Sequence, residues 1–279
     1  MKSRESPDST ETKEFRNYDS KIHDAIRLCY KSQRLHQTRD FSLRMIQKYC
    51  TFERKASFWD LFDSLSNFVD VSDPDINVPN AHHLFQTAES IRKDGHPEWF
   101  QVVGLIHDLG KIMYTFGSDT DGTSVREQWS IVGDTFITGC PIPSTAIFPE
   151  YNKLNRDHKK YTTPFGVYGE TSRNKGLDNV VCAFGHDEYL YRLLKYNQST
   201  LPEEALYMIR YHSLYLWHEK NEYAHFENEM DRKMKPWVKL FNKYDLYTKT
   251  DDTPKDNWKS VRIYYDSIVK NYIPTTLSF

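Results

Sequence analysis

The chain has 279 residues, a formal net charge of −2, 38% hydrophobic residues and 15% aromatic residues. Its near-neutral charge, with no long basic run, argues against a nucleic-acid surface. No apolar stretch approaches the roughly 20 residues that a membrane span needs. We therefore expect a protein that binds neither nucleic acid nor membrane, with a core packed largely by aromatic side chains.

The N-terminal residues and the cysteines indicate the compartment. Residues 1–14 are polar and charged, and we expect them to form a disordered tail rather than a secretory signal. The four cysteines form no CxxC pair, so reduced thiols in a cytoplasmic chain are predicted. Residues 15–279 are expected to form one catalytic domain, acting as a monomer.

Apolar spacing predicts helices through most of the chain. The expected helices cover 24–49 (as one or two helices), 57–68, 80–93, a segment carrying His107-Asp108, 178–194, a segment from Thr200 past His212, 236–249 and 258–272. Residues 117–176 are rich in Gly, Thr and Pro and are expected to be irregular. No run is long enough to build a sheet core. The predicted fold class is all-α, a single domain with long central loops.

Three of these helices carry start signals. Asn80 is a good N-cap for the helix that follows it. Thr200 and Glu203 have the spacing of a capping box, with an early proline between them. Pro236 is expected to open the helix that contains Asp245.

Eleven histidines are present, and four of them lie in apolar or aromatic segments: His83, His107, His186 and His212. A single histidine on an apolar helix face is more often a hydrogen-bonded core residue than a metal ligand. Two of these four, however, are followed directly by aspartate, and that recurrence favours a metal site. Five others have polar neighbours and are predicted to lie at the surface: His23, His36, His96, His158 and His225.

Two aspartates join these histidines as candidate ligands. Asp108 lies in an apolar run, where an uncompensated buried carboxylate would cost roughly 3–5 kcal/mol, so a cation or donors must accompany it. Asp245 shares a helix face with Val238 and Phe241, which indicates burial. The alternative for Asp245 is an exposed ion pair with Lys249.

Four histidines and two aspartates without a thiolate suit iron or manganese as well as zinc. Their wide separation means that separate helices must bring them together, as helical metalloproteins do. Six ligands are too many for one catalytic metal with an open position. They favour a metal pair bridged by Asp108, which could hydrolyse phosphoesters or, with iron, activate dioxygen.

Several longer strings carry a more specific resemblance. They are Asp73-Pro74-Asp75, His83-Leu84-Phe85-Gln86-Thr87-Ala88-Glu89, Gly104-Leu105-Ile106-His107-Asp108-Leu109-Gly110-Lys111, Val132-Gly133-Asp134-Thr135-Phe136, Gly185-His186-Asp187-Glu188-Tyr189, Met208-Ile209-Arg210-Tyr211-His212-Ser213 and Phe241-Asn242-Lys243-Tyr244-Asp245. The order of candidate ligands resembles the HD-domain superfamily. Together with the strings, from about Phe15 to the C-terminus, it is similar to the inositol oxygenase family.

The resemblance implies an HD-type helical fold around a mixed-valent Fe(II)/Fe(III) pair. One iron would be held by His83, His107 and Asp245, the other by His186 and His212, with Asp108 bridging them. The substrate contacts that the family implies are Arg16, Asp70, Ser72, Lys111, Gly133, Asp134, His212 and Ser213. Lys111 would also have a catalytic role by orienting or polarising the substrate.

The implied reaction is the O2-dependent cleavage of the C1–C6 bond of myo-inositol to D-glucuronate. Because the substrate supplies all four electrons, O2 is the co-substrate and no NAD or flavin is expected; none of their glycine motifs is present. The runner-up is an HD-type phosphohydrolase, and a non-catalytic scaffold with a structural metal ranks third. The stretch 117–128 is longer than in the family, and 150–175 matches it weakly.

Overall fold

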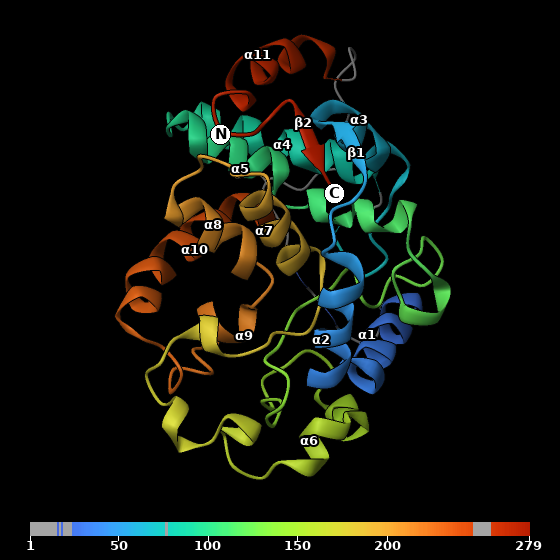
Figure 1. The fold of residues 1–279 in the computed structure, drawn as a ribbon, viewed down its shortest axis with the longest axis vertical. Helices are drawn as coiled ribbons and strands as arrows, with labels where there is room; N and C mark the ends of the chain where they lie inside the picture. The colour runs from blue at the N-terminus through green and yellow to red at the C-terminus, as the bar shows by residue number, and fades with distance from the viewer. Residues whose placement is uncertain (1–15, 17, 19–23, 76–77, 248–257) are drawn as a thin grey trace, which may run out of the picture.

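The computed structural model describes residues 16, 18, 24–75, 78–247 and 258–279. The predicted tail (1–14), His23 and Lys249 lie outside the described residues. Helix dominates the described chain, and its strands are two short segments, β1 and β2, which confirms the all-α prediction (Figure 1).

The N-terminal part of the described chain forms two helices, α1 (Asp24–His36) and α2 (Arg39–Tyr49), as predicted. The break between them is at Thr38, whose side chain accepts a hydrogen bond from the backbone N–H of Phe41 and so caps α2. A third helix, α3 (Phe58–Ser64), continues into a short 3-10 turn and thus covers most of the expected segment 57–68.

A two-stranded antiparallel sheet was not predicted. Strand β1 (Lys55–Ser57) pairs with β2 (Thr276–Ser278) next to the C-terminus. The backbones of Arg54 and Phe279 extend the pairing through two further hydrogen bonds of 3.1 and 2.8 Å. Three-residue strands are too short to show an alternating pattern, so the sequence carried no signal for them.

Five helices carry or surround the candidate ligands: α4 (Asn80–Lys93), α5 (Glu98–Ile106), α7 (His186–Tyr196), α8 (Glu203–Tyr211) and α10 (Glu229–Tyr247). Helices α4 and α5 pack closely because Gly104 has no side chain. A Cβ there would lie 3.0 Å from the backbone of Ala88 and 2.8 Å from Ile91 Cδ1. The close packing brings His83 and His107 onto one site.

The predicted helix starts were less accurate than the helices themselves. Asn80 is the first residue of α4, and its N-cap is Pro79. The N-cap of α8 is Pro202, so Thr200 does not cap it. Pro236 lies inside α10 rather than at its start. Helix α7 begins at His186, because residues 177–179 form only a 3-10 turn. Tertiary packing has overridden local propensity at these ends.

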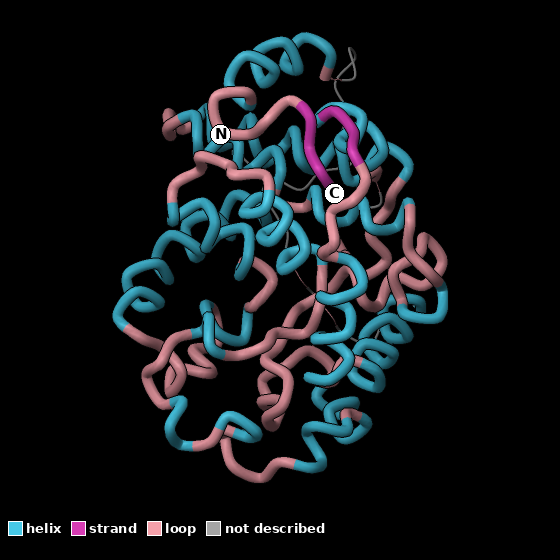
Figure 2. Tube along the Cα trace, in the orientation of Figure 1, coloured by secondary structure: helices cyan, strands magenta, loops and turns pink. Residues whose placement is uncertain are grey.

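Long loops fill the centre of the chain, as predicted, and Figure 2 shows them gathered in the lower half of the molecule. They are interrupted only by short helices among the described residues. The remaining elements are η2 (Leu109–Thr115), η3 (Asp119–Asp121), η4 (Pro149–Leu154), α6 (Arg156–Lys160), η5 (Gly166–Tyr168), η6 (Glu170–Ser172), η7 (Leu177–Asn179), α9 (Tyr215–His218) and α11 (Lys259–Val269).

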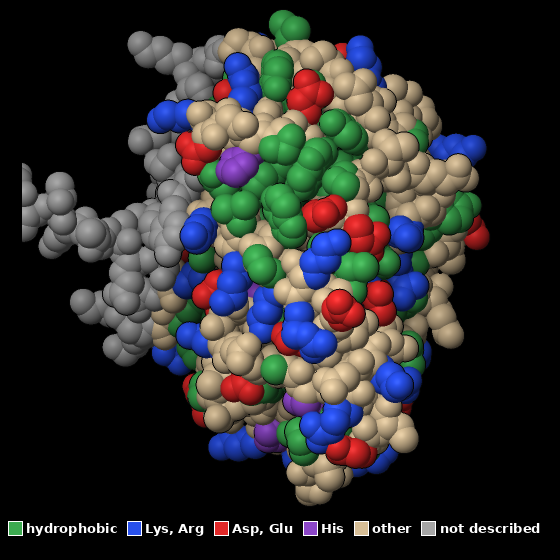
Figure 3. All heavy atoms as spheres, turned by 90° about the vertical axis from the view of Figure 1, so that its left-hand side faces the viewer, with side chains coloured by type: hydrophobic (Ala, Val, Ile, Leu, Met, Phe, Trp, Pro, Cys, Tyr) green, Lys and Arg blue, Asp and Glu red, His purple; other side chains and the backbone are tan. Residues whose placement is uncertain are grey.

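Among the described residues, the core consists of one large apolar cluster beneath the helices, a second cluster beneath the central loops and a small third one at Ile26, Tyr30 and Phe148. The second cluster is built around Phe136, Trp217 and Phe226. Within the described ranges, no helix combines the length and apolar character needed to cross a bilayer. On the face drawn in Figure 3, positive and negative side chains are interspersed over the lower part, and apolar side chains gather above them.

Candidate metal centre

The four predicted histidines converge from four helices. His83 lies in the second turn of α4, and His186 is the first residue of α7. His107 and His212 directly follow the last residues of α5 and α8. The helix expected to carry His107-Asp108 therefore ends at Ile106, and the helix expected to run past His212 ends at Tyr211. All four side chains are buried, with at most 4% of each residue exposed.

Backbone carbonyls fix the orientation of three imidazole rings. The Nδ1 atoms of His107, His186 and His212 lie 3.0, 2.6 and 2.9 Å from the carbonyl oxygens of Gly104, Ile131 and Ile209. A carbonyl oxygen can only accept, so each Nδ1 carries the proton and donates it. In the neutral ring, Nε2 is then unprotonated and its lone pair can bind a metal, which is the arrangement found in metal-bound histidine.

The lone pairs then face one another at close range. Nε2 of His186 lies 3.0 Å from Nε2 of His212 and 3.1 Å from Asp108 Oδ1. Nε2 of His107 is buried without a hydrogen bond and lies 3.3 Å from Asp245 Oδ1. Buried acceptors that point at other acceptors require a cation between them. The residues present therefore fit a metal.

The candidate ligands divide into two groups that share one carboxylate. His83, His107 and Asp108 form the first group, and Asp108, His186 and His212 form the second, with ligand atoms within 4.8 Å of one another in each. Asp245 Oδ1 completes the first group, 2.9 Å from His83 Nε2. Such a shared carboxylate is the arrangement that a bridged pair of metals requires.

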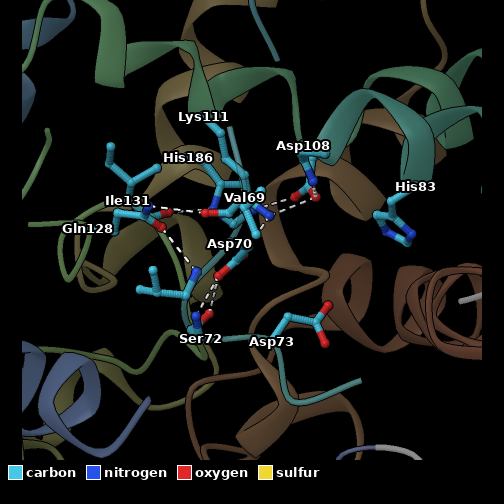
Figure 4. A network of polar contacts seen from close by, with 12 residues as sticks. Val69, Asp70, Ser72, Asp73, His83, Asp108, Lys111, Gln128, Ile131 and His186 are labelled. Atoms are coloured by element: carbon cyan, nitrogen blue, oxygen red, sulfur yellow. Dashed lines mark hydrogen bonds and ion pairs between the residues drawn. The ribbon is translucent and has the colours of Figure 1, made fainter. Parts of the chain in front are cut away.

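Asp108 and Asp70 are both paired with Lys111, as Figure 4 shows. The Lys111 ammonium donates hydrogen bonds of 2.7 Å to Oδ2 of each carboxylate. Burial alone would raise the pKa of Asp108, but the adjacent Lys111 ammonium outweighs it and holds the pKa well below its usual range. The pKa of Asp70 is lowered in the same way, against burial, by Lys111 and by hydrogen bonds from Lys111 and Ser72.

The turn that carries His107-Asp108 packs directly on the start of α7. A Cβ at Gly110 would lie 2.0 Å from the carbonyl oxygen of His186, so only glycine permits this approach. Gly104 and Gly110 therefore both allow backbone segments to approach one another closely.

Nearly all of the predicted site residues line one pocket. Its lining includes the predicted substrate contacts Arg16, Asp70, Ser72, Lys111, Gly133, Asp134, His212 and Ser213, together with His83, Asp108, His186 and Asp245. His107 is absent from that lining and lies behind it. The structure thus brings together every residue that the sequence singled out for the site.

Arg16 and Asp134 close one side of this pocket. Arg16 Nη2 donates to both carboxylate oxygens of Asp134, at 2.9 and 2.7 Å, and its guanidinium lies 3.5 Å from the ring centre of Tyr215. Burial would lower the pKa of Arg16, but Asp134 and Tyr215 raise it well above its ordinary value. Gly133, which also lines the pocket, has a φ of +87°, a left-handed turn conformation that favours glycine.

Several pocket residues were not assigned to the site from the sequence. Asn80 was expected to cap α4, yet its side-chain amide donates a 2.8 Å hydrogen bond to Asp108 Oδ2. Tyr30 is buried in α1, and its hydroxyl donates to Asp134 Oδ1 at 3.2 Å. Tyr18 and Tyr215 also line the pocket, and no local pattern marked them.

Histidine burial alone does not define a ligand. His82 and His218 are also buried, but His82 accepts a hydrogen bond from the Trp258 indole and His218 lies 2.9 Å from the carbonyl oxygen of His212. His36, His96, His158 and His225 are not buried, as predicted. The candidate ligands differ from His82 and His218 in pointing at one another.

The fold and this pocket define the class of the protein: a helical chain with a buried His/Asp cluster suited to two metals and an adjoining polar pocket. The family model for myo-inositol oxygenase matches residues 23–279. The chain therefore belongs to the myo-inositol oxygenase family, and it is an oxidoreductase of the metal-dependent oxygenase type.

Relatives from distant organisms agree with this assignment. The inositol oxygenase of Danio rerio is 42% identical over 275 residues, which cover 98% of this chain and 94% of that protein. The inositol oxygenase of Dictyostelium discoideum is 41% identical, covering 96% and 90%. Inositol oxygenase 1 of Arabidopsis thaliana is 40% identical, covering 95% and 84%.

Proposed function

We propose that this chain is a di-iron myo-inositol oxygenase that cleaves the C1–C6 bond of myo-inositol with O2 to give D-glucuronate. The observation that carries the substrate assignment is the charge of the pocket. Six carboxylates line it, namely Asp70, Asp73, Asp75, Asp108, Asp134 and Asp245. Among the described residues that line it, the cations are Arg16 and Lys111, and both are already paired with some of these carboxylates.

This charge distribution suits a neutral polyol. Ring hydroxyls both donate and accept hydrogen bonds, so they match carboxylate acceptors, the Lys111 ammonium and the Ser72 and Ser213 hydroxyls. A phosphoester would bring further negative charge to the six carboxylates and would find no arginine cluster to hold its phosphate. The phosphohydrolase alternative is disfavoured for this reason.

The metal assignment follows the two groups of ligands. His83, His107 and Asp245 would hold one iron, His186 and His212 the other, and Asp108 would bridge them. The absence of thiolate and the mixture of imidazole and carboxylate suit iron. When bound, the mixed-valent Fe(II)/Fe(III) pair would supply the redox centre at which O2 reacts and the Lewis acid that acidifies substrate hydroxyls.

The protein side chains would bind and orient the ring. Asp70 and Asp134 would accept hydrogen bonds from hydroxyls on the side away from the metals. Lys111, which lies between Asp70 and Asp108, would donate to the hydroxyl nearest the metal pair and so polarise it. Arg16 and Tyr215 would cover the ring and exclude water from it.

The test uses protein loaded anaerobically with Fe(II) and then partly oxidised. After addition of myo-inositol and O2, we expect equimolar oxygen uptake and D-glucuronate formation. Oxygen-independent phosphate release from a phosphoester panel, with no glucuronate, would replace the oxygenase by the hydrolase. A metal that no substrate perturbs would instead indicate the structural scaffold.

We also propose that residues 15–279 form the catalytic domain and act as a monomer in the cytoplasm. All four cysteines (Cys29, Cys50, Cys140 and Cys182) are free, which suits a reducing compartment. Burial raises the pKa of the Cys50 thiol to about 12 and that of Cys140 to about 12, so these thiols are unreactive. Cell fractionation and size-exclusion chromatography with light scattering would test both statements.

A further inference from the structure

A buried glutamine outside the pocket holds the loop that carries Asp70. Gln128 is 4% exposed and is the last residue of the long loop 117–128. Its side-chain oxygen accepts a 3.2 Å hydrogen bond from the backbone N–H of Val71, and its side-chain nitrogen donates 3.1 Å bonds to the carbonyl oxygens of Val69 and Val125. The side-chain amide is therefore hydrogen-bonded to the backbone on both sides of Asp70 (Figure 4).

The segment around Asp70, to which Gln128 is hydrogen-bonded, belongs to no helix or strand. Residues 68–70 are irregular, and 71–72 form a turn. Asp70 projects from this loop to Lys111, and Lys111 continues to Asp108. The place of the Asp70 carboxylate in the pocket thus depends on a loop backbone that a side chain of another segment holds.

The same residue begins the turn that orients His186. The backbone N–H of Ile131 donates to the Gln128 carbonyl oxygen at 2.8 Å. The Ile131 carbonyl oxygen accepts from the backbone N–H of His186 at 3.1 Å and lies 2.6 Å from His186 Nδ1. One short turn, 128–131, therefore contacts the loop of Asp70 at one end and a candidate metal ligand at the other.

We propose that Gln128 is a positioning residue for substrate binding: it sets Asp70, and through Asp70 the Lys111 ammonium, at a fixed distance from His186. Gln128 does not line the pocket and touches no substrate. Its effect passes through the backbone of Val69 and Val71. This proposal rests on the function proposed above.

The main test compares two buried glutamines. Gln128→Met removes the amide at similar volume. Gln101→Met is the matched control, because Gln101 is 5% exposed and its amide bonds the His96 carbonyl and the Tyr264 hydroxyl, away from the pocket. Both variants should lose similar thermal stability and keep their iron. Loss of two positioning hydrogen bonds should weaken myo-inositol binding about tenfold in Gln128→Met alone.

Binding is measured by anaerobic calorimetry with myo-inositol, beside the iron content of each variant. A double-mutant cycle with Asp70→Asn identifies the route: if Gln128 acts through Asp70, Gln128→Met should change the Kd of Asp70→Asn by less than about twofold. Independent, additive effects would overturn the proposal. So would a Kd of Gln128→Met equal to that of Gln101→Met.

Two further measurements keep the test decisive. If Gln128→Met does not fold, Gln128→Asn keeps the amide one methylene shorter, and it should weaken binding without loss of iron; unchanged binding would again overturn the proposal. The wild-type protein separates the two proposals. Wild type that makes no glucuronate refutes the proposed function, whereas active wild type with an unaffected Gln128→Met refutes only the positioning role.

Discussion

The candidate ligands and the substrate side of the pocket are held in place by different means. The imidazoles of His107 and His212 sit at helix ends and donate to carbonyls of their own helices, three residues back. Asp70 and Asp134 lie in loops and are fixed by side chains from distant segments, Lys111 and Arg16. The arrangement of His107 and His212 is local and tolerant of change elsewhere, although His186 donates to the distant Ile131 carbonyl. The arrangement of Asp70 and Asp134 depends on a few long-range contacts.

This difference predicts two kinds of variant. Removal of a ligand should abolish one metal position while leaving the helices that carry it folded. Removal of a contact on the substrate side should leave the metals in place and shift substrate binding or local stability. The predictions below test that separation, beginning with the largest effect.

His212→Ala should lose one iron and all turnover. The helix α8 ends at Tyr211, so its fold does not need the imidazole, whereas the second ligand group keeps only Asp108 and His186. Iron per chain, measured by a colorimetric chelator, should fall from two to about one, and glucuronate should disappear. His225→Ala, outside both ligand groups, is the control. Full activity of His212→Ala would refute the ligand assignment.

The same difference decides what the sequence reveals. All four candidate histidines lie in apolar or aromatic segments, and that setting is visible in the sequence itself. Asp245 was also readable, because Val238 and Phe241 share its face, and it is 6% exposed. The cluster was thus predictable as a set of candidates from local pattern alone.

The substrate side was not readable from local pattern. Arg16 and Asp70 look like solvated charges in the sequence, and only the family resemblance marked them. Asn80 has the position of a helix cap, yet its amide bonds Asp108. The strands β1 and β2 meet only because the C-terminus returns to residue 55. Contacts made by distant segments leave no periodic signal, so these features needed either the family resemblance or the structure.

Lys111→Met should damage the substrate side while sparing the metals. The variant leaves the buried carboxylates of Asp70 and Asp108 without their shared ammonium, which should cost the iron-free protein about 3–5 kcal/mol in urea unfolding. Turnover should fall roughly 10²-fold, because the polarising donor is lost. Iron content should stay near two.

A matched lysine sharpens this prediction. Lys48 also pairs with an aspartate, Asp121, but its side chain is 54% exposed. Lys48→Met should therefore cost less than about 1 kcal/mol and leave turnover unchanged. Equal destabilisation by the two substitutions would mean that burial of the Lys111 cluster contributes nothing.

Asp121→Asn tests the far end of the loop 117–128. The Asp121 carboxylate accepts hydrogen bonds from Lys48, Tyr49 and Thr123 at 2.6, 2.9 and 2.6 Å. Burial opposes its ionisation, but these donors lower its pKa. The substitution should cost about 1–2 kcal/mol at pH 7 in urea unfolding. Turnover should stay within about twofold, because Gln128 holds the near end of the loop.

The pH dependence of that difference has a definite sign. A carboxyl whose pKa is lower in the folded state stabilises the protein above its unfolded pKa, near 3.9, and the stabilisation is lost as pH falls through the lower folded value. The gap between wild type and Asp121→Asn should therefore be constant from pH 7 to about pH 5 and shrink below about pH 4. A gap that grows in acid would contradict the assignment.

Gly133→Ala separates backbone strain from substrate binding. Gly133 has a φ of +87°, and an added Cβ would meet Gln33 and Tyr30 at 3.4 Å, which is ordinary contact. The free energy of unfolding should fall by about 1–2 kcal/mol because of the backbone conformation alone.

Gly95→Ala is the control, since its φ is +75° and no atom lies within 4 Å of the added Cβ. Both variants should lose similar stability in urea unfolding, but only Gly133→Ala should raise the Kd for myo-inositol, because the Gly133 turn presents Asp134 to the pocket. If the two variants bind myo-inositol equally well, the turn at Gly133 merely connects segments, and Asp134 keeps its place through Arg16 and Tyr30.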